Sequence, residues 1–154
     1  MKKVFVSMMA VCAMATALLC GCGEKAADFD VKALGSELST GITYQDSLTE
    51  LDKDTASMFL NLSDINIEEC AIYEGSGATA EEIVVLKCAS ADDSAKAKAM
   101  LEERVKEQTE SFTDYVPGEL TKLGAAVIKI NGNYAVLSVS DTPDEASKII
   151  SKYM

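Results

Sequence analysis

Five cysteine thiols are the side chains in this sequence best suited to covalent chemistry, because a deprotonated thiol is a nucleophile. Three of them, Cys12, Cys20 and Cys22, lie near the amino terminus, and the other two are Cys70 and Cys88. Cys22 follows an apolar leader, which predicts that its thiol carries an acyl anchor. Cys70 and Cys88 form an even pair, and in an oxidising compartment such a pair is a disulfide candidate.

The pairing of Cys70 with Cys88 has two possible outcomes. Hairpin symmetry about Thr79 is expected to place the two cysteines opposite one another on neighbouring strands. Direct opposition is tight for a disulfide, whose Cα atoms prefer a separation of about 5.5–6 Å. Two buried free thiols are therefore slightly favoured over a bond.

The leader has the order of a secretory signal: Met1-Lys2-Lys3, an apolar run over 4–19, then Leu19-Cys20-Gly21-Cys22. The last four residues resemble the bacterial lipobox. We therefore expect a signal peptide over 1–21, a lipidated Cys22 with a short tether over 22–30, and one domain over 31–154. The expected location is the outer face of the cytoplasmic membrane or the cell envelope. An ordinary signal peptide cut near Gly21 or Gly23, or an uncleaved anchor, is the alternative.

The acidic charge narrows the classes of partner. The whole chain has a formal net charge of −11, and loss of Lys2 and Lys3 with the leader makes the mature chain more negative still. Nucleic-acid affinity comes mainly from Lys and Arg on phosphates, and basic residues also mediate docking on anionic lipid. We therefore expect no nucleic-acid partner, and contact with the membrane through the lipid anchor alone.

The absence of histidine from the sequence removes Ser-His-Asp and Cys-His catalysis as well as His-ligated zinc. Carboxylate chemistry remains, and its nearest metal-like patterns are Asp28-Phe29-Asp30 and Asp52-Lys53-Asp54. Neither pattern continues as a calcium-binding EF-hand loop, and aspartates at helix starts are good caps. We expect helix caps there, and neither a metal nor a cofactor. Three acidic pairs are expected to be solvated charge: Glu68-Glu69, Glu81-Glu82 and Glu102-Glu103.

Two functions remain compatible with this composition. The first is a non-catalytic binding or protein-interaction module, which is not an enzyme and whose partner is an unknown protein, peptide or small molecule. The alternative is a carboxylate-dependent hydrolase acting at the cell envelope. A cleft with two carboxyl groups about 5–10 Å apart would favour the hydrolase.

The elements that must position these residues follow from apolar spacing and turn residues. The patterns predict the order ααββαββα, an α+β fold with a four-stranded antiparallel sheet and helices mainly on one face. Strand 82–89 is apolar on both faces, as expected of a central strand. The expected ranges are helices over 31–41, 47–62 and 92–115, strands over 68–73 and 82–89, a hairpin over 125–140 around Asn131-Gly132, and a final helix from Pro143.

One face of the predicted hairpin is a possible interaction surface. In the expected register Val127 lies opposite Val136, and Lys129 lies opposite Tyr134. This face mixes apolar and polar side chains. Either the first two helices cover it as a second core layer, or it stays open and binds a partner.

Four segments of the chain form a recognisable series: Leu51-Asp52-Lys53-Asp54-Thr55, Glu82-Ile83-Val84-Val85-Leu86-Lys87, Met100-Leu101-Glu102-Glu103-Arg104 and Gly132-Asn133-Tyr134-Ala135-Val136-Leu137. In order and spacing these segments resemble the domain-of-unknown-function 4358 family. The resemblance covers about residues 28–152 and implies a small lipoprotein. It implies no catalytic or binding residue.

Overall fold

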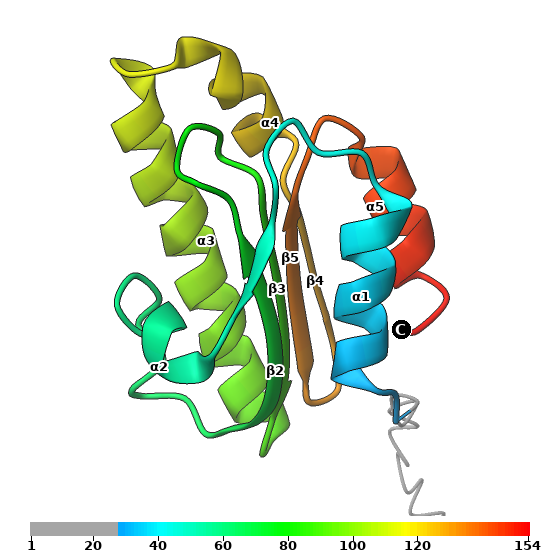
Figure 1. The fold of residues 1–154 in the computed structure, drawn as a ribbon. Coiled ribbons are helices and arrows are strands. Elements are labelled where there is room, and N and C mark those ends of the chain that lie inside the picture. Colours follow the sequence, from blue (N-terminus) through cyan, green and yellow to red (C-terminus); the bar gives the residue numbers. More distant parts are fainter. Residues whose placement is uncertain (1–27) are drawn as a thin grey trace, which may run out of the picture.

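A five-stranded antiparallel sheet forms the centre of the protein in the computed structural model, which describes residues 28–154 (Figure 1). The strand order is β1-β2-β3-β5-β4, so β1 and β4 are the edges. The sheet therefore has one strand more than the four expected, and the additional strand is the edge strand β1. The strands are β1 (Thr49–Leu51), β2 (Ile67–Glu74), β3 (Glu82–Cys88), β4 (Val127–Asn131) and β5 (Tyr134–Val139).

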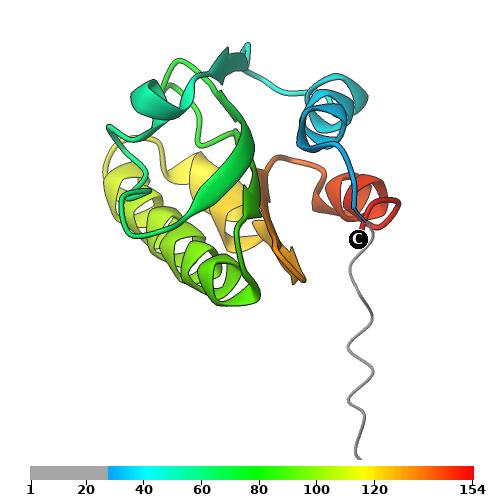
Figure 2. The same cartoon turned by 90° about the horizontal axis from the view of Figure 1, so that it is seen from below.

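Helices cover both faces of the sheet, which Figure 2 shows from below. One face carries α1 (Val31–Gly41) and α5 (Pro143–Ile150), and the other carries α3 (Ala91–Thr113). Three short elements complete the fold: α2 (Lys53–Ala56), the 3₁₀ turn η1 (Pro117–Glu119) and α4 (Leu120–Gly124). The prediction that helices lie mainly on one face is therefore wrong. The apolar residues on both faces of β3 and β5 require a cover on each side.

The region 47–62, predicted to be helical, instead contains the edge strand β1 and the short helix α2. Thr49, Glu50 and Leu51 pair with the last three residues of β2. The helix starts later, where the Asp52 side chain accepts a hydrogen bond from the amide of Thr55 at 2.8 Å. The cap at Asp52 and the pairing with β2 together determine where the helix begins.

Three predicted helices occur close to their expected positions. Asp30 caps α1 through the amides of Lys32 and Ala33, and α3 is capped by Ser90, whose hydroxyl accepts from Asp93. Pro143 is the first residue of α5, as the preference for proline at that position predicts. The capping residues thus determine where the helices begin.

The β4–β5 hairpin turns through Gly132 and Asn133, with Asn131 opposite Tyr134. Gly132 has a φ of 55°, whereas no described non-glycine residue has a positive φ, so the turn fits type II′. The register is two residues from the expected one. A shift of two residues keeps every side chain on its expected face, because side chains alternate with a period of two.

Two apolar layers fill the space between the sheet and its helices. The layer under α3 includes Ile72, Val84, Leu86 and Leu101. The layer under α1 and α5 contains Leu34, Leu38, Val85, Val136 and Ile149 among others. No helix within residues 28–154 is both long and apolar enough to cross a membrane.

Candidate functional site

The face of the hairpin proposed for interaction is covered by helices. Val127, Tyr134 and Val136 belong to the layer beneath α1 and α5, and they are 8%, 3% and 0% exposed. Lys129 lies on the same strand face and is exposed. This face is therefore a second core layer, but α1 and α5 cover it instead of the first two predicted helices, because β1 and the short α2 replace the helix expected over 47–62. Val127, Tyr134 and Val136 are therefore buried core residues, and Lys129 alone of the four is exposed.

Cys70 and Cys88 are not opposed in the observed register. Cys70 pairs with Leu86 and Cys88 pairs with Ile67, across a bulge between Ile67 and Glu69. Both thiols are free. The prediction that Cys70 and Cys88 lie opposite one another is therefore wrong. Burial raises the pKa of both thiols, for Cys88 to about 11, so neither is activated as a nucleophile.

The aspartates of the two metal-like patterns have structural contacts. Asp30 and Asp52 are the N-caps of α1 and α2, as expected. Asp28 accepts hydrogen bonds from the Tyr134 hydroxyl and from Lys87 Nζ. Within the described part of the chain, no cluster of three or more potential metal ligands was found. Cys22 lies outside the described residues.

Glu81 and Glu82 are fully buried, although the sequence suggested solvated charge. Glu82 and its cross-strand partner Glu74 share one cation, Arg104 on α3. Arg104 Nε lies 3.1 Å from Glu82 Oε2, and Arg104 Nη2 lies 2.9 Å from Glu74 Oε1. The sequence did not reveal this cluster, because its cation, Arg104, lies on α3 and far along the chain from both glutamates.

The pKa values of both carboxyl groups of this cluster are raised above their usual range. Burial, followed by repulsion from the Glu82 carboxylate, raises the pKa of Glu74 to about 8 against the attraction of Arg104. Burial also raises the pKa of Glu82. The remaining oxygens, Glu74 Oε2 and Glu82 Oε1, find no partner among the described residues. Such a pair resembles the carboxyl dyads of acid–base catalysis, but the Glu82 side chain has no exposed surface for a substrate.

A second buried ion cluster surrounds Lys122 of α4, which is 3% exposed. Its ammonium lies 3.1 Å from both Glu81 and Glu119. The Glu81 carboxylate also accepts hydrogen bonds from the amides of Gln45 and Asp46. Burial alone would raise the pKa of Glu81, but these amides and Lys122 hold it below its usual value. This cluster fastens the 45–46 loop to α4.

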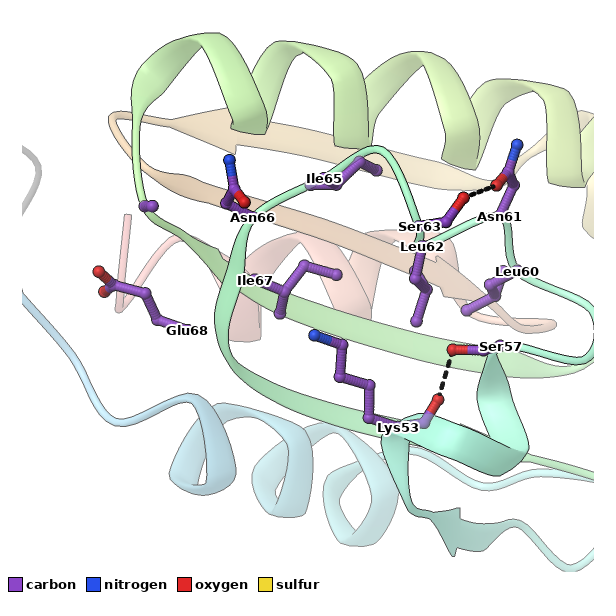
Figure 3. Close-up of a pocket in the computed structure, with 11 residues that line it drawn as sticks. Lys53, Ser57, Leu60, Asn61, Leu62, Ser63, Ile65, Asn66, Ile67 and Glu68 are labelled. Carbon is purple, nitrogen blue, oxygen red and sulfur yellow. Dashed lines mark hydrogen bonds between the residues drawn. The ribbon is translucent and has the colours of Figure 1, made fainter.

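A candidate site is a cleft of about 480 Å³ between α2, the following loop and the start of β2 (Figure 3). Ile67, Leu60 and Leu62 point into the cleft, and the Lys53 side chain extends toward Ile67. Hydroxyl and amide groups form the rest of the wall. They include Ser57, Asn61, Ser63 and Asn66. The cleft combines an apolar interior with hydrogen-bonding groups and one ammonium, which suits ligand binding.

A neighbouring cleft of about 450 Å³ opens between the same loop and α3. Phe59 and Met100 supply its apolar surface, and the guanidinium of Arg104 lies 4.7 Å from the centre of the Phe59 ring. Asn61 and Ile65 line both clefts. The loop 57–66 therefore separates two recesses on one side of the protein.

Comparison with known proteins gives a family but no activity. The family model described as "Domain of unknown function (DUF4358)" matches residues 42–140, which is well over half of the chain. No curated protein matches. No solved structure matches either. The matched segment contains all five strands and both buried ion clusters. The chain belongs to the DUF4358 family.

Proposed function

We propose that this protein is a membrane-anchored extracytoplasmic lipoprotein that acts as a non-catalytic binding or protein-interaction module. The observation that carries the binding proposal is the cleft beside β2. Its apolar residues, hydroxyls, amides and Lys53 ammonium can hold a ligand by contact and hydrogen bonding. The order of residues around Cys22 supports the lipid anchor.

The alternative of a carboxylate-dependent hydrolase has less support. The carboxyl pair, Glu74 and Glu82, is neutralised in part by Arg104, which forms an ion pair with each. Glu82 is fully buried, so a substrate would have to displace part of the core to reach it. The cleft beside β2 is lined by one carboxylate, Glu68, which points away from its interior (Figure 3).

The experiment that tests binding is site-specific photo-crosslinking in intact cells. A photo-reactive amino acid placed at Ser57, on the cleft wall, should give one discrete covalent adduct. The same amino acid at Ser36, which is exposed on α1, is the matched control and should give none. Equal labelling from both positions, or no adduct from Ser57, would count against a binding site in the cleft.

The same cells can report on the anchor. Cys22→Ala should abolish acylation and leave the leader uncleaved, because acylation of the cysteine thiol comes before cleavage of a lipoprotein signal peptide. Mass spectrometry of the protein measures both. An acylated product with an unchanged amino terminus would reject Cys22 as the anchor, and it would leave the binding proposal in place.

A further inference from the structure

Strand β2 is longer than the edge strand that covers it. β1 pairs only with Ile72, Tyr73 and Glu74, at the far end of β2. The first part of β2, residues 67–71, pairs with β3 on its inner side and has no strand on its outer side. Within residues 28–154, no other backbone segment bonds to that outer side. Within the described residues, the outward-facing backbone groups of this half-strand therefore lack the strand partner that a sheet interior provides.

The cleft described above lies along this free half-strand. The chain leaves the edge where β1 ends, forms α2, and returns through the loop 57–66 to begin β2 (Figure 1). Ile67 belongs both to the free edge and to the cleft, next to the buried side chains of Leu60 and Leu62. A strand added at the edge could therefore place a side chain in an apolar recess. Backbone pairing with alternate side chains in pockets is how sheet edges recognise extended peptides.

The acidic residues at this edge favour a basic partner. Its exposed residues Glu68 and Glu69 carry two carboxylates, and the only ion pair that either makes within the described residues is from Glu69 to Lys87 at 3.8 Å. The surrounding segment 52–69 has acidic side chains at five positions and a single basic one. They are Asp52, Asp54, Asp64, Glu68 and Glu69, against Lys53. Two copies of this edge would repel each other, whereas a basic segment would be attracted.

The opposite edge of the sheet offers no comparable site. β4 carries an exposed lysine, Lys129, in the middle of the strand, and its charge would repel a basic segment. The recess beside it, which includes Ile130 and Ile150, has a volume of about 140 Å³. The edge of β2 is therefore the better place for an added strand.

We infer that residues 67–71 of β2 bind an extended basic segment of another protein by strand addition. Basic side chains of that segment lie against Glu68 and Glu69, and an apolar side chain enters the cleft beside Ile67. This inference rests on the proposed binding function and names the class of its partner.

The test uses the lipidated protein in neutral detergent and an eight-residue peptide of alternating lysine and valine. Binding is measured by calorimetry, and amide hydrogen exchange is followed over residues 67–71. We expect protection of the outward-facing amides on binding. A peptide of the same composition with two valines changed to proline should bind at least about tenfold more weakly, because proline cannot complete the ladder. A glutamate–valine peptide should not bind.

Two charge variants complete the test. Glu68→Lys with Glu69→Lys should weaken binding at least about tenfold, through loss of attraction and added repulsion. Glu110→Lys with Asp114→Lys changes the net charge equally at exposed positions at the end of α3, and it should leave affinity within about twofold at moderate salt.

Three results would overturn the inference: equal losses in both double variants, equal affinity for the proline peptide, or no protection at 67–71. If the Ser57 crosslink is specific while these results appear, the cleft binds something other than a basic strand. If the Ser57 crosslink also fails, the proposed function fails with the inference.

Discussion

Replacing Lys122 with methionine should lower the free energy of unfolding by about 3–5 kcal/mol, because it leaves two buried carboxylates without their cation. The lysine side chain is 3% exposed, and the side chains of Glu81 and Glu119 are 0% and 7% exposed. Methionine has a similar length and no charge. The loss therefore reports mainly on unpaired charge rather than on a cavity.

Denaturant unfolding of a soluble form measures this loss. Lys129→Met is the matched control, since Lys129 is exposed and such surface changes usually stay within about 0.5 kcal/mol. Adding Glu119→Gln to the Lys122→Met variant should recover part of the loss, because one unpaired charge is removed. A loss below about 1 kcal/mol for Lys122→Met would mean that the cluster does not hold α4 to the sheet.

Truncating Tyr134 to alanine should lower the free energy of unfolding by about 3–5 kcal/mol, the range for large aromatic side chains in a core. The ring is 3% exposed and stacks on Phe29 with centroids 4.1 Å apart. Its hydroxyl donates to Asp28. The sequence places Asp28 and Phe29 in the polar tether, but both contact Tyr134 of β5. The variant therefore also loosens the start of the domain.

A second variant separates the ring from the hydroxyl. Tyr134→Phe keeps the stacking and removes one hydrogen bond, so its loss should be about 0.5–1.5 kcal/mol. Chemical denaturation of the two variants measures the loss of stability from the ring and the loss from the hydroxyl. Near-native stability of Tyr134→Ala would show that this face of the sheet is not covered, and it would restore the hairpin face as an interaction surface.

The sequence predicts the elements whose signals are local. Asp30 before an apolar stripe, Pro143 at a helix start and the glycine turn at Gly132 are all read within a few residues, and each marks a real element. Alternation of apolar residues also assigns the hairpin faces correctly. That assignment survives an error of two residues in the register, because side chains alternate with a period of two.

Features that depend on distant partners could not be read from the sequence. β1 has three residues and exists because β2 offers it a partner, while the capping pattern at Ser47 and Glu50 favours a helix. The burial of Glu81 depends on Lys122, 41 residues later, and that of Glu82 on Arg104, 22 residues later. An acidic pair next to a turn is usually solvated, so only tertiary structure reveals these two clusters.

The candidate site was missed for the same reason. The sequence directed attention to the hairpin face of Val127, Tyr134 and Val136, where α1 and α5 leave no surface. The cleft is instead formed by a loop that was expected to be helical. Its walls combine Lys53, Ser57 and Ile67, which come from α2, the loop 57–66 and β2. No local pattern links these three residues before the chain folds.

The central claim is that helices cover both faces of the sheet and that the outer edge of β2 over residues 67–71 is free to pair with another strand. Amide hydrogen exchange of the unliganded protein tests it most directly. We predict that outward-facing amides among residues 67–71 exchange at least about a hundredfold faster than those of Ala135 and Val136, which should open only with global unfolding. Protection of every amide over 67–71 to the level of Ala135 and Val136 would contradict the account.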